Sequence, residues 1–203
     1  MKKYIIISIL ILLSITTIVC YSKYKATQKE LLTKNVIFDI IEDVEGIVIS
    51  CITKSGNKSM SEQDKLDFAV RYIIENRQNF SSDIIKKEST YYNKEENINF
   101  GKVDVKFFNR ILNKFFTCSD YTITDYKHYK NGFIELDFEP IENTSFDRKE
   151  YIDVQVEQDK YIINAKYTRT LNELKNEFYV QYIFNVDENI KISEVTIYNS
   201  IMN

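Results

Sequence analysis

The sequence predicts an N-terminal transmembrane helix followed by an α+β domain, in which about three helices pack on a curved antiparallel sheet of about six strands. Three observations lead to this fold class. An uncharged apolar run follows Lys3, apolar residues between positions 27 and 118 recur at helical steps of three and four, and beyond residue 119 apolar and polar residues alternate. Because helical and strand patterns are segregated along the chain, we expect the helices on one face of an antiparallel sheet.

The apolar run covers residues 4–21 and contains no charged residue. A helix of this length spans about 27 Å, close to the ~30 Å of a hydrocarbon core. Tyr4 and Tyr21 stand at its two ends, where aromatic rings favour the membrane interface. The sequence therefore predicts a short cytoplasmic head at residues 1–3 and a transmembrane signal-anchor at residues 4–22, whose partner is the lipid bilayer.

Three processing fates fit this segment. It can remain as a signal-anchor, which gives a single-pass protein of the cell membrane with the bulk of the chain extracytoplasmic. It can be cleaved after Ser22, with Cys20 and Ser22 as the small residues near the cleavage site, which gives a secreted protein. It can also be lipidated at Cys20, although Val19 occupies a position where a small residue is expected. The length of the run favours the signal-anchor.

Composition limits the remaining chain to one ordinary globular domain. Of the 203 residues, 44% are hydrophobic and 28% charged, which disfavours disorder. The formal net charge is −3, with 27 Lys and Arg against 30 Asp and Glu. Because nucleic-acid binding relies on basic residues that neutralise phosphates, this acidic balance argues against a nucleic-acid partner.

Three helices are predicted after the anchor. The first covers residues 27–54 and belongs to a segment, residues 23–58, that we interpret as a helical stalk or first helix; Gly46 could break it, and residues 46–52 could instead form a strand. The domain proper then covers residues 59–203. Ser61 and Asp64 form a capping-box pattern that starts a helix ending near Asn79. Residues 81–102 are interpreted as a loop, and residues 104–118 as the third helix.

The strands are predicted from alternation and turn residues. Residues 126–138 form a hairpin around Asn131-Gly132, the preferred type I′ pair. Strands at 152–156 and 161–167 follow, joined by a tight turn at Gln158-Asp159. Strands at 178–186 and 190–198 complete the set, and a change of phase indicates a bulge near Ser193.

This order of elements behind one transmembrane helix resembles an NTF2-like or cystatin-like extracytoplasmic domain. The outer domains of VirB8-type secretion and conjugation components are similar in layout. The resemblance covers the order of elements over residues 60–199 and involves no sequence motif. It therefore implies a fold and a location, and it transfers no site residue.

The residues that carry common chemistries are sparse. The single histidine, His128, and Cys118 form the one plausible nucleophile–base pair, ten positions apart; the alternative is a buried thiol and a surface imidazole. No clustered His, Cys and carboxylate spacing predicts a metal, and the four glycines are too scattered for a phosphate-binding loop. We therefore predict no catalytic residue, no metal and no cofactor.

Three further groups allow two interpretations each. Cys51 and Cys118 form a disulfide in an oxidising compartment or remain separate buried thiols. A row of carboxylates on one strand either faces solvent or lines the mouth of a cavity with an acid–base role: Glu135, Asp137 and Glu139. A set of aromatic residues forms either the core or a ligand-binding cone: Tyr161, Tyr167, Phe178, Tyr182 and Phe184.

These features favour an anchored interaction or assembly domain that has a protein partner at the membrane and is not an enzyme. A small-ligand binder that uses the concave face of the sheet is the first alternative. An enzyme with a cavity carboxylate is the second. A filled concavity favours the first interpretation, a deep apolar pocket the second, and a deep pocket with convergent carboxylates the third.

Overall fold

The structure is a computed structural model that describes residues 2–56, 58–86, 101–117, 123–136, 146–171, 174–187 and 189–202, with the backbone alone for residues 2–13, 55, 86, 171, 174 and 199–202. Its helices are α1 (Lys2–Ser55), α2 (Glu62–Glu75), α3 (Val105–Phe115) and the 3₁₀ helix η1 (Ile123–Asp125). Its strands are β1 (Ile84–Lys86), β2 (Gly101–Asp104), β3 (Tyr129–Lys130), β4 (Phe133–Leu136), β5 (Arg148–Glu157), β6 (Lys160–Leu171), β7 (Leu174–Val186) and β8 (Ile190–Met202). The chain forms two compact units, residues 1–42 and 43–203.

The predicted α+β class is confirmed, but the prediction of a single six-stranded sheet is wrong. Within the described ranges the strands form two antiparallel four-stranded sheets: sheet A, in the order β5-β6-β7-β8, and sheet B, in the order β1-β2-β4-β3. The stretch 81–102, interpreted as a loop, contains β1 and the start of β2. These strands have three and four residues, too few to show a clear alternation.

Helix α1 runs without a break through Gly46, so the helical interpretation of residues 27–54 is confirmed. In its last turns, inside the larger unit, six consecutive residues are buried, from Ile47 to Ile52. A helix buried on all sides needs no polar stripe, and this explains why the sequence there also resembled a strand. Across the part of the chain that the structure describes, no helix combines the length and apolar character needed to cross a membrane.

Sheet A is a meander whose helix-facing side forms the main core. Ile163 pairs with Tyr182, and Ala165 with Val180, with all four side chains almost completely buried. The bulge predicted near Ser193 is confirmed, because Phe184 pairs with Ile192 while Ile183 pairs with Glu194. The extra residue allows Ile192 and Val195 to face the same core.

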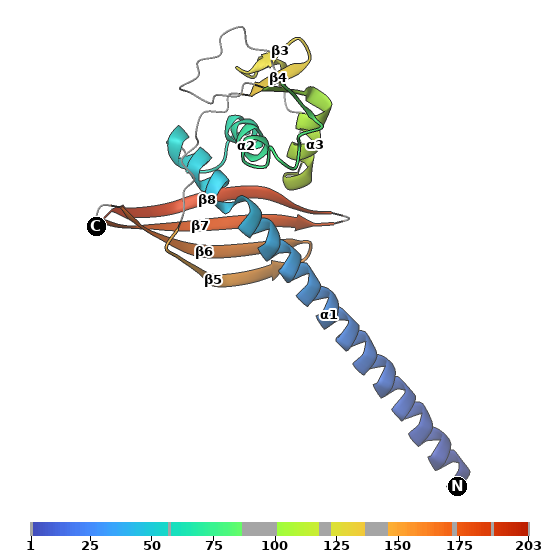
Figure 1. The fold of residues 1–203 in the computed structure, drawn as a ribbon. Helices are drawn as coiled ribbons and strands as arrows, with labels where there is room; N and C mark the ends of the chain where they lie inside the picture. The colour runs from blue at the N-terminus through green and yellow to red at the C-terminus, as the bar shows by residue number, and fades with distance from the viewer. Residues whose placement is uncertain are drawn as a thin grey trace. The chain divides into compact units, whose positions relative to one another are not determined.

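Figure 1 shows α2 and α3 on one side of sheet A, with sheet B beyond them. Phe68 of α2 packs edge-on against Phe115 and Phe116, at ring-centroid distances of 5.4 and 5.1 Å. The capping box predicted at Ser61 and Asp64 is confirmed. So is the hairpin between β3 and β4, where Asn131 and Gly132 adopt φ values of +49° and +81°.

Candidate functional site

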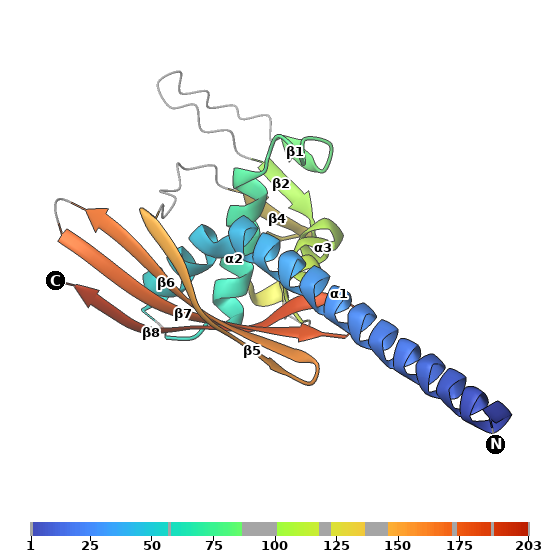
Figure 2. The same ribbon diagram turned by 90° about the horizontal axis from the view of Figure 1, so that it is seen from below.

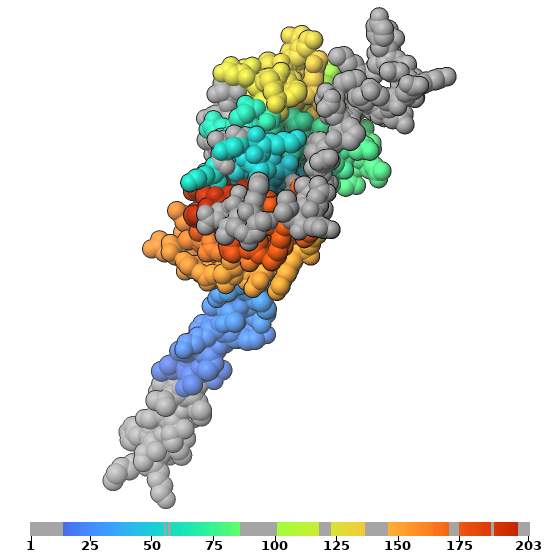
Figure 3. All heavy atoms as spheres, turned by 90° about the vertical axis from the view of Figure 1, so that its left-hand side faces the viewer, coloured from blue at the N-terminus to red at the C-terminus, as the bar shows by residue number. Residues whose placement is uncertain are grey.

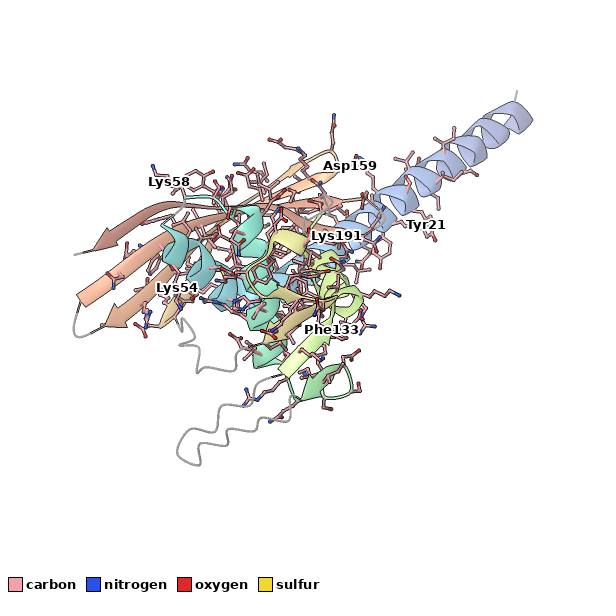
Figure 4. All side chains as sticks on the ribbon, turned by 90° about the horizontal axis from the view of Figure 1, so that it is seen from above. Tyr21, Lys54, Lys58, Phe133, Asp159 and Lys191 are labelled. Carbon is pink, nitrogen blue, oxygen red and sulfur yellow. The ribbon has the colours of Figure 1, made fainter. Side chains whose placement is uncertain are left out.

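The two edge strands of sheet A, β8 and β5, differ in whether other segments of the chain hydrogen-bond to them. At β8, two short segments add backbone hydrogen bonds: the amide of Met60 donates to Val195 (2.9 Å), and the amide of Ile197 donates to Lys58 (2.7 Å). Farther along, the amide of Thr117 donates to Ile192 (2.9 Å). These three hydrogen bonds use backbone groups of Ile192, Val195 and Ile197 on an edge that would otherwise face solvent. Lys58, labelled in Figure 4, marks one of the covering segments.

At the opposite edge lies β5, which pairs with β6 alone among the residues that the structure describes. We call the side of this strand that does not pair with β6 the β5 edge and define it as residues 148–157. Ile152 and Val156 are large apolar residues on it, with 54% and 45% of their surface exposed. Figure 1 shows β5 at the lower border of the meander, Figure 2 shows the same strand from below, and Figure 3 shows atoms of this region, in orange, at the molecular surface. A strand edge with free backbone groups is a template for pairing with another strand.

Strand β5 does not keep the phase that the sequence indicates. Ile152, Val154 and Val156 alternate in sequence, but a bulge places Ile152 opposite no residue of β6. Tyr151 pairs with Ala165, and Asp153 with Asn164. Lys149 and Tyr151 therefore face the helices, while Ile152 is exposed.

A shallow pocket of about 130 Å³ lies on the face of sheet A away from the helices. We call it the charged pocket; its lining comes from β5, β6 and β7: Arg148, Glu150, Lys166, Thr168, Lys175 and Glu177. Glu177 accepts from both Lys166 and Lys175 at 2.8 Å. Bonding to Lys166 and Lys175 lowers the pKa of Glu177 to about 2, and Glu177 in turn raises the pKa of Lys166. The carboxylate already engages these two cations, which leaves little free positive charge for an anionic ligand.

A second polar group lies on the helix-facing side of sheet A. The hydroxyl of Tyr167 donates to Glu45 Oε2 (3.0 Å) and lies 3.1 Å from the hydroxyl of Tyr182. Lys149 Nζ is 3.2 Å from the same Glu45 oxygen. Burial, followed by the nearby oxygens of Tyr182 and Glu45, raises the pKa of Tyr167 far above its ordinary value, so it remains a neutral donor. These contacts connect the Glu45 end of α1 to sheet A.

The helices carry further polar contacts of the same structural kind. Tyr72 donates to Asp43 (2.8 Å) and accepts from Lys114 (3.0 Å). Arg71 donates to Ser50 (2.6 Å), beside Cys51. Cys51 is a free, buried thiol, and burial raises its pKa to about 12. A thiol that stays protonated at neutral pH is a poor nucleophile.

The residues singled out from the sequence do not converge on one place. His128 is partly buried and packs edge-on against Tyr126 (5.2 Å between ring centroids). Cys118, Asp137 and Glu139 lie outside the described residues, so neither the pair with His128, nor the disulfide with Cys51, nor the full carboxylate row is seen. Glu135 keeps 43% of its side chain exposed and pairs with Lys130 (3.7 Å), as a solvent-facing residue would.

The aromatic set is core, as one of its two interpretations predicted. Tyr161, Tyr167, Tyr182 and Phe184 are buried, and Phe178 is partly buried. Sequence reasoning missed the ion pair of Glu45 with Lys149, because these residues are more than a hundred positions apart. It also missed the pairs of Glu177 with Lys166 and Lys175, because the pairing of Lys166 depends on how β6 and β7 are aligned. The β5 edge was missed as well, since strand order is needed to recognise an edge. Its one local signal is the alternation of Ile152, Val154 and Val156 with polar residues.

No set of three or more His, Cys, Asp or Glu side chains within the described ranges is placed to hold a metal ion. No family model, curated protein or solved structure matches the chain.

Proposed function

We propose that this chain is a membrane-anchored, extracytoplasmic interaction or assembly domain and that the β5 edge is where it binds a protein partner. The observation that carries the proposal is the difference between the two edges of sheet A. The segments at 58–60 and 116–117 cover part of the β8 edge, whereas no described segment covers β5. Exposed Ile152 and Val156 add apolar surface to that edge.

The membrane part of the proposal rests on the sequence. Residues 4–21 are uncharged, with Lys2 and Lys3 before them, and a helix of this length matches a hydrocarbon core. The bilayer is thus the proposed partner of residues 4–22, and the chain after them is proposed to lie outside the cytoplasm. A helix-covered antiparallel meander also supports the proposed NTF2-like or cystatin-like layout.

Interaction is favoured over ligand binding in the concave face because that face is filled. Tyr167, Tyr182 and Phe184 are fully buried on the side where a ligand cone would open. The charged pocket lies on the opposite face and holds about 130 Å³, well below the ~300 Å³ or more that is typical of small-molecule sites.

Protease accessibility tests the topology. Protease added to intact host protoplasts that express the full chain should digest the region after residue 27. Lysed protoplasts serve as the positive control. Protection of this region until lysis would show that the domain faces the cytoplasm and would refute the proposed location.

Site-specific photo-cross-linking tests the edge. A photoreactive residue in place of Ile152 should form protein adducts in native membranes. A matched probe in place of Tyr198, which is 51% exposed but lies on β8, should form few. Equal labelling from both positions, or none from Ile152, would contradict a partner at the β5 edge.

A separate experiment tests the proposal that the chain is not an enzyme. Because His128 packs on Tyr126 away from the charged pocket and β5, His128→Gln should leave the host phenotype unchanged. A phenotype equal to that of a deletion strain, with the variant folded and at normal abundance, would refute this expectation.

A further inference from the structure

We propose that Lys25 and Lys29 of α1 bind the headgroup of an anionic lipid where the helix leaves the membrane. This inference rests on the proposed function, in which residues 4–22 span the bilayer, and it names the class of lipid that the bilayer supplies. All the residues involved lie in the compact unit 1–42. Three features of α1 support it: the depth of the two lysines, the distribution of charge along the chain and the face of the helix that they share.

Helix α1 continues without a break from the proposed membrane span into the residues that follow it. Each residue advances a helix by about 1.5 Å, and the headgroup layer on each side of a bilayer is about 5–8 Å thick. A helix that leaves the hydrocarbon core at residue 22, along the membrane normal, therefore carries Lys25 within the headgroup layer. Lys29 lies about 10 Å beyond the core. Its long side chain can reach back, because helical side chains lean towards the N-terminus, which here is the side of the membrane.

Positive and negative charges are separated along the chain. Residues 1–29 contain five lysines and no acidic residue, whereas residues 30–203 contain 22 basic and 30 acidic residues. The first acidic residue, Glu30, pairs with Lys34 at 2.8 Å. An anionic membrane surface therefore attracts the part of α1 that leaves the bilayer and repels the acidic remainder of the chain.

Lys25 and Lys29 lie on one face of α1, because residues four apart are neighbours on a helix surface. Both lysines are exposed. Like charges at this spacing destabilise a helix, and an anion between the two ammonium groups removes the repulsion. Tyr21 lies one turn earlier on the same face, is 66% exposed and is labelled in Figure 4. A tyrosine at the border of the core followed by two cations suits a lipid whose acyl chains lie beside the ring and whose phosphate lies beside the lysines.

A lipid fits this face better than the other possible occupants. A second copy of the chain would bring the same lysines together, and like charges oppose association. An acidic protein would match the charge. In the proposed topology, however, lipid headgroups surround the helix at this depth at a far higher concentration than any single protein.

Quenching by brominated lipids measures which lipid lies beside the helix. The chain contains no tryptophan, so Tyr21→Trp in the full chain supplies a single fluorophore on the face of the two lysines. This protein is reconstituted in phosphatidylcholine vesicles that contain either brominated phosphatidylglycerol or brominated phosphatidylcholine. Attraction of one lysine to an anionic surface corresponds to about a fivefold change in binding, so phosphatidylglycerol should associate about fivefold or more strongly at low salt. About 1 M salt should remove most of this preference.

Two matched double variants, each made in the Tyr21→Trp protein, locate the lysines responsible. Lys25→Gln with Lys29→Gln should reduce the preference for phosphatidylglycerol to less than about twofold. Lys34→Gln with Lys54→Gln removes the same number of charges from α1, but at least about 18 Å beyond the core, which is farther than a Debye length. This control should leave the preference unchanged. Circular dichroism checks that both variants keep their helical content.

The outcomes separate this inference from the proposed anchor. If neither brominated lipid quenches the introduced tryptophan, residue 21 does not lie at the bilayer, and both proposals fail. If both lipids quench it equally, the anchor stands and the anionic-lipid site is overturned. A preference that survives the loss of Lys25 and Lys29, or that the control variant also loses, overturns the site as well. Equal quenching together with capture of an acidic protein by a photoreactive residue in place of Lys25 would show that the lysines bind a protein instead.

Discussion

The two faces of sheet A are built from alternate residues of the same strands, yet they serve opposite purposes. Towards the helices, Tyr167, Tyr182 and Phe184 are completely buried, and the polar atoms there form a small closed network with Glu45. On the outer face, Lys166 and Glu177 form ion pairs that remain hydrated. The comparison shows that stability is concentrated on one face, which leaves the other face and the β5 edge free to vary or to bind.

The largest difference between the faces should appear when apolar side chains are shortened. Phe184→Ala should cost about 3–5 kcal/mol of unfolding free energy, because it removes buried contacts and leaves a cavity. Ile183 is its neighbour on the outer face, and Ile183→Ala should lower the unfolding free energy by less than about 1 kcal/mol. Urea unfolding of both variants measures the difference, and similar losses would show that the outer face is also buried.

A smaller difference should separate two tyrosine hydroxyls. Tyr167→Phe removes the hydroxyl shared by Glu45 and Tyr182, and we expect a loss of about 1–3 kcal/mol. On the outer face, Tyr179 makes a long contact to Glu177 (3.4 Å), and Lys166 Nζ lies 5.4 Å from the centre of its ring. Tyr179→Phe keeps this ring, so it should change stability by less than about 0.5 kcal/mol. Urea unfolding of both variants measures these changes. An unchanged unfolding free energy for Tyr167→Phe would show that the network does not stabilise the fold.

The smallest effect concerns pH. The pKa of Glu177 is lowered from 4.5 to about 2, so its ion pairs stabilise the fold above pH 4.5, and this stability is lost as the pH falls towards 2. Glu177→Gln has no such carboxylate and should lose less stability across that window. Thermal unfolding midpoints of the two proteins between pH 5 and 2 test the prediction; parallel curves would contradict it.

Local features of the fold could be predicted, and pairing between distant segments could not. The capping box at Ser61, the turn at Asn131-Gly132 and the bulge at Ser193 each depend on a few adjacent residues, and all three are confirmed. The bulge at Ile152 was missed because a regular alternation of Ile and Val covers it. The division into two sheets was missed because β4 pairs with β2, which precedes α3 in the chain. Strand β2 is too short to show a periodic signal in the sequence.

The candidate site was even less accessible from the sequence. An edge is defined by the strand that is missing beside it, and no residue type encodes that directly. The closure of β8 depends on Lys58 and Met60, which lie more than a hundred residues before it in the chain. The predicted absence of a catalytic site remains a prediction, which the His128 variant tests.

The buried end of α1 also has a consequence for the order of folding. Glu45, at the start of this end of α1, is synthesised about a hundred residues before its partners on sheet A, Lys149 and Tyr167. Contacts between such distant segments slow folding, because a long loop must close before they stabilise the chain. During that interval α2 can already contact the helix, through Arg71 with Ser50 and Tyr72 with Asp43, but the side that packs on sheet A lacks its partner and is prone to aggregation. We expect refolding to be slow, and the protein to depend on chaperones until β8 has been synthesised.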